Sequence, residues 1–164
     1  MNTDTIVRIT GREILNAHGK PTVEARLVTS EKIVAVASVQ SGTSTGTYEA
    51  YELYDGGLRY GGYGTKVAAA NISQSINDAL KGMSLDDPVK LDRKLIALDG
   101  TENKSKLGAN AILSVSMAVA KAGALAAQKD LYVWIYYLAQ QLGMKNSVKV
   151  PIPLFNMING GLHG

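Results

Sequence analysis

The stretch from Ala109 to Gln128 constrains the fold most strongly, because its side chains are apolar or small on nearly every face of a helix. One face carries the larger apolar residues together with two alanines: Ile112, Val115, Val119, Ala122 and Ala126. The other faces carry mostly Ala, Ser and Met. Helices of this kind are typically buried, and small side chains allow neighbouring elements to approach closely. We therefore expect a buried central helix.

The first forty residues predict β structure. Apolar and charged residues alternate over 23–27, while residues 6–9 and 33–39 are rich in β-branched side chains. The segments 16–19 and 30–32 are short enough to join adjacent antiparallel strands. These patterns predict a three-stranded antiparallel meander.

Helical spacing of apolar residues begins near residue 67 and ends at Gly82. Asp87 followed by Pro88 is typical of a helix start, and a further helix is predicted after Asp130. That last helix carries a stripe of apolar residues: Leu131, Ile135, Leu138 and Leu142. Strands followed by helices favour an α+β fold, so we expect a three-stranded meander followed by a four-helix layer.

The composition excludes several kinds of protein. The chain has 164 residues, which is about one domain with a short remainder. It contains no Cys, so disulfides, thiolate zinc sites and thiol nucleophiles are excluded, and its two His are too far apart in sequence for a metal-ligand motif. The 17 basic and 14 acidic residues form no basic run, which disfavours nucleic-acid binding. We predict no secretory signal and no membrane span, and expect a cytoplasmic protein.

Residues 40–64 lose this periodicity and are rich in Gly, Ser, Thr and Tyr. Such long irregular segments are usually functional or disordered. Within it, the SGTSTG segment from Ser41 to Gly46 could bring backbone and hydroxyl groups close to an oxyanion or a hard cation, although a mobile polar loop has the same composition. The later GGYGTK segment lacks the Gly-Lys-Ser/Thr of a phosphate-binding loop, and we interpret it as a turn before a helix.

Residues 150–158 form a short apolar run that contains two Pro and is followed by Gly. This pattern is typical of a strand buried on both faces, as in parallel sheets. Such a strand needs neighbours, so we expect residues 1–148 to form one domain and residues 149–164 to begin another. His163 lies just beyond the run, where α/β proteins place binding and catalytic groups, although a lone His near a chain end is more often exposed and idle.

Four segments carry a resemblance to a known family. They are NAHGKPTVE (16–24), SGTSTGTYEAYEL (41–53), LDGTENKSKLGANAILSVSMAVAKAGA (98–124) and PIPLFNMINGG (151–161). Together and in this order they resemble enolase, the phosphopyruvate hydratase of glycolysis, and the third segment is by far the most specific. The resemblance covers nearly the whole chain. It implies an N-terminal domain of a meander and four helices, followed by an eightfold α/β barrel whose first strand would be residues 150–158.

The resemblance also implies a reaction, the reversible dehydration of 2-phosphoglycerate to phosphoenolpyruvate, with two Mg²⁺, a Lys base and a Glu acid. The segment after residue 40 is similar to the mobile loop of the family, which closes over the phosphorylated three-carbon acid. The loop residues implied are Ser41, Gly42, Thr43, Ser44 and Thr45. Ser44 would bind the second Mg²⁺ through its hydroxyl and carbonyl, and His163 would contact the substrate near the reacting carbons.

Several positions depart from the family pattern around these segments. Ala17-His18 replaces Ser-Arg and Lys20 replaces Asn in the first segment, so an Arg close to the family's active site is missing. The other departures lie beside the loop and beside His163: Gln40 for Pro, Thr43 for Ala, Leu162 for Ser and Gly164 for Ala. These changes indicate a divergent relative.

By the same resemblance, the base, the acid and the carboxylates that bind the first Mg²⁺ would all lie beyond residue 164. We therefore expect the N-terminal portion of an enolase, inactive without a barrel and completed by a barrel chain or a homo-oligomer. The alternative is a non-catalytic enolase-like module that binds a partner. Glu24, which would pair with a barrel Arg across the family's dimer, is expected to be solvated here. The apolar tail is expected to be disordered, to pack back on its own domain or to pair with another chain.

Overall fold

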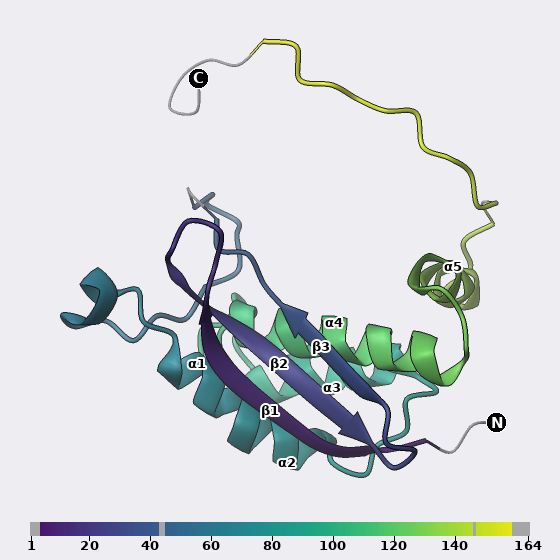
Figure 1. Ribbon diagram of the computed structural model, residues 1–164, viewed down its shortest axis with the longest axis horizontal. Coiled ribbons are helices and arrows are strands. Elements are labelled where there is room, and N and C mark those ends of the chain that lie inside the picture. Colours follow the sequence, from purple (N-terminus) through teal and green to yellow (C-terminus); the bar gives the residue numbers. More distant parts are fainter. Residues whose placement is uncertain (1–3, 43–44, 146, 159–164) are drawn as a thin grey trace.

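The computed structural model describes residues 4–42, 45–145 and 147–158. Within them a three-stranded antiparallel sheet has the strand order β1-β2-β3, and helices cover one of its faces (Figure 1). The strands are β1 (Ile6–Leu15), β2 (Pro21–Thr29) and β3 (Val34–Ser38). The predicted meander and both of its turns are confirmed.

Four helical segments follow the sheet, as the sequence predicts. The first is a continuous run of α1 (Lys66–Asn71), a π-helical stretch (Ile72–Ile76) and α2 (Asn77–Leu80). The others are α3 (Pro88–Asp99), α4 (Ala109–Ala126) and α5 (Leu131–Gln141), and a short 3₁₀ turn (Arg59–Gly62) precedes α1. The described part of residues 149–164 contains no helix or strand, so a barrel strand is not seen.

The core lies between the sheet and α4, which packs on β2 and β3 and also contacts α3 and α5. Its largest fully buried apolar side chains come from both layers: Ile6, Ile9, Val23, Leu27, Ile72, Ile76, Leu80, Leu91, Leu95, Val115 and Val119. The prediction of a central helix holds for most of its circumference. However, α4 exposes three large apolar side chains, Leu113, Met117 and Leu125.

Among the described residues, α4 is also the one helix long and apolar enough to cross a membrane by length and composition. Half of that helix is buried inside the protein. The core helix of a globular domain has the same length and composition, and the packing of α4 on the sheet is of that kind.

The helical run of α1 and α2 lies against the outer edge of β1 and supplies its hydrogen-bond partners. The backbone N–H of Ile9 donates to Asn77 Oδ1 (2.8 Å), and that of Gly11 donates to Ser73 Oγ (2.9 Å). The approach is very close, because a Cβ atom on Gly11 would lie 2.5 Å from the carbonyl oxygen of Ala69. A buried or shielded sheet edge needs such partners for its free N–H groups.

The apolar stripe predicted for α5 is not its buried face. Leu131, Ile135 and Leu142 are exposed, whereas Trp134 is buried with its indole ring against Gly123 of α4. The reason is that α5 packs mainly on α4, at Gly123, where α4 has no side chain and a large ring fits. Sequence periodicity alone selects the wrong face.

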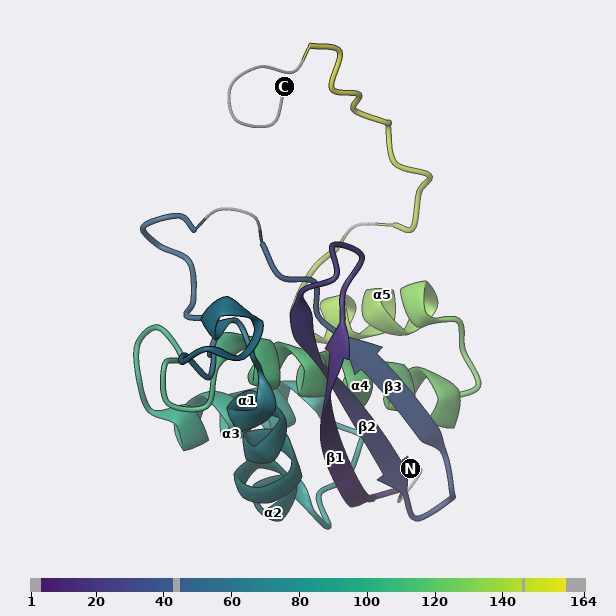
Figure 2. The ribbon, with the colours of Figure 1, turned by 60° about the vertical axis from the view of Figure 1, so that its left-hand side comes forward.

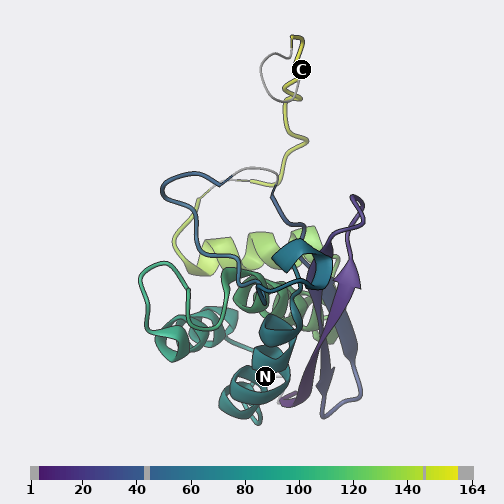
Figure 3. The same cartoon turned by 90° about the vertical axis from the view of Figure 1, so that its left-hand side faces the viewer.

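Residues 147–158 leave the domain body as an extended segment (Figure 1). Their apolar side chains are strongly exposed, with Val150 at 93% and Leu154 at 96%. Of the three outcomes expected for the tail, packing back on its own domain is therefore not seen for these residues. Figures 2 and 3 both place the tail at the same end of the molecule as the β1–β2 turn and the segment that follows β3.

Candidate functional site

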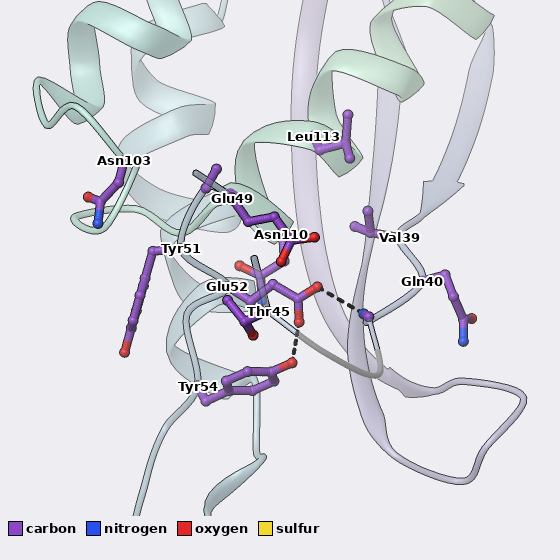
Figure 4. A pocket seen from close by; sticks show the side chains of 13 residues that line it. Val39, Gln40, Thr45, Glu49, Tyr51, Glu52, Tyr54, Asn103, Asn110 and Leu113 are labelled. Carbon is purple, nitrogen blue, oxygen red and sulfur yellow. Dashed lines mark hydrogen bonds between the residues drawn. The ribbon is translucent and has the colours of Figure 1, made fainter. Parts of the chain in front are cut away.

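A cleft of about 470 Å³ lies at this end of the domain, between the segment after β3 and the start of α4 (Figure 4). Its walls come from two stretches of the chain that are distant in sequence, residues 39–54 and 103–113. They are lined by Val39, Gln40, Gly42, Thr45, Glu49, Ala50, Tyr51, Glu52, Tyr54, Asn103, Ala109, Asn110 and Leu113. The cleft therefore joins two of the segments that carry the family resemblance.

One wall of the cleft is an extended segment that hydrogen bonds hold against α4 and the preceding loop. The N–H of Tyr51 donates to the carbonyl of Asn103 (2.7 Å), and the carbonyl of Tyr51 accepts from the N–H of Ala109 (2.8 Å). The Asn110 side chain pairs with both backbone groups of Leu53, at 3.2 and 3.1 Å. The Asn110 amide thus satisfies the backbone N–H and C=O of Leu53, as a neighbouring strand would do.

The loop before α4 is shaped by Asp99, the last residue of α3, which is 2% exposed. Its carboxylate accepts hydrogen bonds from the N–H and the hydroxyl of Thr101 and from the N–H of Leu107 (2.7 Å). Burial acts to raise the pKa of Asp99, but these hydrogen bonds outweigh it and hold the pKa below its ordinary 3.8. The loop ends at Gly108, whose φ of +95° is accessible to glycine.

Two carboxylates lie in the cleft, and both already have partners. Glu49 accepts from the N–H of Gly46 (2.6 Å). Glu52 accepts from the N–H of Gly42 (3.4 Å) through one oxygen and from the Tyr54 hydroxyl through the other. Burial and the Glu52 carboxylate raise the pKa of Tyr54 to about 12, against a lowering by the Ser41 hydroxyl. Tyr54 therefore stays a neutral donor at physiological pH.

A second polar cluster fixes the chain just before α1. Glu13 pairs with the Arg59 guanidinium through both oxygens and accepts from the N–H of Thr65 (2.6 Å). Asp55 accepts from the first two N–H groups of α1, those of Lys66 and Val67 (3.0 and 2.8 Å). Carboxylates at this helix end satisfy free N–H groups and face the positive end of the helix dipole. The GGYGTK segment is thus a turn before a helix, as predicted.

The Glu13 cluster predicts a dependence of stability on pH. Hydrogen bonds from Arg59 lower the pKa of Glu13 to about 2, from an ordinary 4.5. A lowered pKa in the folded state means that the stabilisation is complete above about pH 4.5 and is lost as the pH falls towards 2. Glu13→Gln should lower the free energy of unfolding by about 1–2 kcal/mol at pH 7, a figure that allows for solvent screening of the exposed Arg59. Urea unfolding of both proteins at pH 7, 4 and 2.5 measures this difference in the free energy of unfolding.

The difference between Glu13→Gln and the unsubstituted chain should shrink steadily across that series. Glu31→Gln is the matched control, because Glu31 is exposed and its hydrogen bond to the Asp4 carboxylate is made by its backbone N–H. A difference that stays constant from pH 7 to pH 2.5 would contradict the role assigned to Glu13.

The predicted loop residues fall partly on the cleft. Gly42 and Thr45 line it, and Ser41 is close enough to Tyr54 to affect its pKa. Thr43, Ser44 and His163 lie outside the described residues. The sequence did not indicate that Glu52, Tyr54 and Asn110 shape the cleft, because their hydrogen bonds form only when separate segments of the chain come together.

Two residues of the first resembling segment can also be placed. His18 is exposed in the β1–β2 turn. The expectation that Glu24 is solvated is wrong, because its carboxylate pairs with Arg12 Nε at 2.5 Å. Arg12 and Glu24 lie directly opposite each other in the register of β1 and β2, where an oppositely charged pair is favourable.

The described residues contain no group of three or more His, Cys, Asp or Glu side chains that could hold a metal ion. Glu49 and Glu52, the two carboxylates that line the cleft, are held by protein groups instead. Mg²⁺ prefers about six oxygen ligands. The residues seen here do not, by themselves, fit a Mg²⁺ site.

Comparison with known proteins identifies the family to which this chain belongs. The family model described as the N-terminal domain of enolase matches residues 6–135, so the chain belongs to the enolase family. Enolase B of Dictyostelium discoideum is 48% identical over 160 residues, which cover 97% of this chain and 35% of the relative. The chain thus spans about a third of the length of this relative.

Proposed function

We propose that the chain acts as the N-terminal domain of an enolase and contributes to a site that converts 2-phosphoglycerate to phosphoenolpyruvate, in cytoplasmic glycolysis. The observation that carries the proposal is the 48% identity to Enolase B over 160 residues, which spans every segment that builds the cleft. In this role the segment Ser41–Thr45 covers the substrate and His163 contacts it. The hydroxyl and carbonyl of Ser44 are Mg²⁺ ligands in the completed site.

A barrel must supply the rest of such a site. One serine provides two of the roughly six oxygens that Mg²⁺ takes, and the nearby carboxylates Glu49 and Glu52 are bound to protein groups. The remaining ligands, the base and the acid therefore belong to another part of an enolase or to a partner chain. The exposed apolar segment 150–158 supports this, since a first barrel strand without its neighbours leaves such side chains uncovered.

A chimera tests the proposal directly. The chain replaces the matching 35% of Dictyostelium Enolase B, and the absorbance of phosphoenolpyruvate is followed with 2-phosphoglycerate and Mg²⁺. We expect turnover by the chimera and none by the 164-residue chain alone. In the chimera, Ser44→Ala should lower turnover at limiting Mg²⁺ about 10- to 100-fold, the usual effect of disturbing a metal site.

The matched control is Thr47→Ala, which removes a hydroxyl from an exposed position just outside the loop and should leave turnover unchanged. A chimera that folds and binds Mg²⁺ but gives no turnover would contradict the proposal. That result would favour the alternative, a non-catalytic module that binds a partner.

A further inference from the structure

The hydrogen bonds around Glu52 connect the start of the predicted loop to the floor of the cleft (Figure 4). After β3, the carbonyl of Val39 accepts from the Thr22 hydroxyl (2.6 Å), and the N–H of Val39 donates to Val23 (3.2 Å). Among the described residues that follow, the next backbone group to be hydrogen-bonded is the N–H of Gly42, which donates to Glu52. Glu52 thus binds the backbone at Gly42, just beyond the last hydrogen bonds that join this segment to β2.

The position of Glu52 is itself fixed by Tyr54. The Tyr54 hydroxyl donates to the carboxylate oxygen that Gly42 does not use. Its ring meets Tyr63 edge to face, with centroids 5.4 Å apart, and Lys20 Nζ lies 5.1 Å from the centroid of Tyr63. Edge-to-face and cation–π contacts of this kind hold aromatic rings in place. The contacts therefore form a continuous path from the β1–β2 turn to Gly42.

We propose that Glu52 and Tyr54 are positioning residues that fix Ser41 and Gly42, and thereby set where the chain enters the predicted substrate loop. Glu52 binds the Gly42 N–H through one oxygen and takes its orientation from Tyr54 through the other. Lys20, one of the residues that depart from the family pattern, supports Tyr54 through Tyr63. The catalytic meaning of this arrangement rests on the proposed function, whereas the anchoring of Gly42 does not.

A paired set of variants tests the anchoring in the full 164-residue chain. Amide hydrogen exchange is measured by NMR at Gly42 and at core amides of β2. Tyr54→Phe keeps the ring against Tyr63 but removes the hydroxyl, and Glu52→Ala removes the carboxylate. Each should accelerate exchange at Gly42 about three- to tenfold, the usual effect of losing one hydrogen bond, and leave the β2 amides unchanged.

Two further variants separate anchoring from general damage. Glu52→Gln keeps an acceptor of the same size, so the exchange rate at Gly42 should fall between those of the unsubstituted chain and Glu52→Ala. Tyr51→Phe removes a hydroxyl from the same cleft but keeps both backbone hydrogen bonds of Tyr51, and should leave Gly42 unaffected.

The proposal is overturned if Gly42 exchanges at the same rate in the unsubstituted chain, Glu52→Ala and Tyr54→Phe. It is also overturned if exchange accelerates equally at Gly42 and in β2, or if Tyr51→Phe has the same effect as Tyr54→Phe. None of these readouts uses turnover. Failure of the anchoring is therefore distinguishable from failure of the enolase chimera.

Discussion

Gly11→Ala should lower the free energy of unfolding by about 2–3 kcal/mol, the upper part of the usual range for overpacking a core. A Cβ at this position would lie 2.5 Å from the carbonyl oxygen of Ala69 and 2.7 Å from Cβ of Ile72. Neither atom can move alone, because one belongs to the backbone of α1 and the other to a fully buried side chain. The helical run would have to shift away from β1, and the hydrogen bonds from Ile9 and Gly11 to Asn77 and Ser73 would lengthen.

Urea unfolding followed by far-UV circular dichroism measures this change. Gly46→Ala is the matched control, because a Cβ there meets no atom closer than 3.7 Å, and we expect a change within about 0.5 kcal/mol. If Gly11→Ala were as stable as the unsubstituted chain, the close contact of the helix with β1 would be wrong.

Asp99→Ala should have an effect of comparable or larger size, about 2–4 kcal/mol, because it leaves buried donors without an acceptor. The carboxylate is almost completely buried and accepts from two residues of the loop, Thr101 and Leu107. Without it, the loop that carries Asn103 to the cleft loses its anchor on α3. We expect both lower stability in urea and faster proteolysis between residues 100 and 108.

Asp99→Asn should fall between alanine and the native residue, since its amide oxygen can still accept while its NH₂ group would face another donor. The control is Asp130→Ala, because Asp130 is exposed and its side chain makes no capping hydrogen bond. Equal stabilities of Asp99→Ala and Asp130→Ala would show that the loop does not depend on this carboxylate.

The sequence predicts the strands and most helix ends because these depend on local signals. The Asp87 side chain accepts from Lys90, and Gly100 ends α3 with a φ of +70°, as capping preferences require. The buried face of α5 could not be predicted in this way, since it depends on the shape of a partner helix at Gly123. Periodicity describes one helix at a time.

The cleft is less accessible to sequence reasoning than the fold. The resemblance points to the loop after β3 and to residues 98–124, but not to how they meet. Asn110 reaches Leu53 across 57 positions, and no local pattern indicates that an amide will pair with a distant backbone. The Arg12–Glu24 pair could have been predicted from the sequence, because the short β1–β2 turn fixes which residues lie opposite each other.

The helix beside β1 also governs how copies of the protein can associate. Since Asn77 and Ser73 accept from the outward N–H groups of Ile9 and Gly11, a further strand cannot pair with β1 at these two positions. The other edge of the sheet is β3, where the Lys121 ammonium group donates to the carbonyl of Val36 (2.8 Å). Lysine at a strand margin opposes sheet-to-sheet growth. Addition of strands from other copies is therefore disfavoured at both edges of this sheet. Copies that associate would do so through side-chain surfaces.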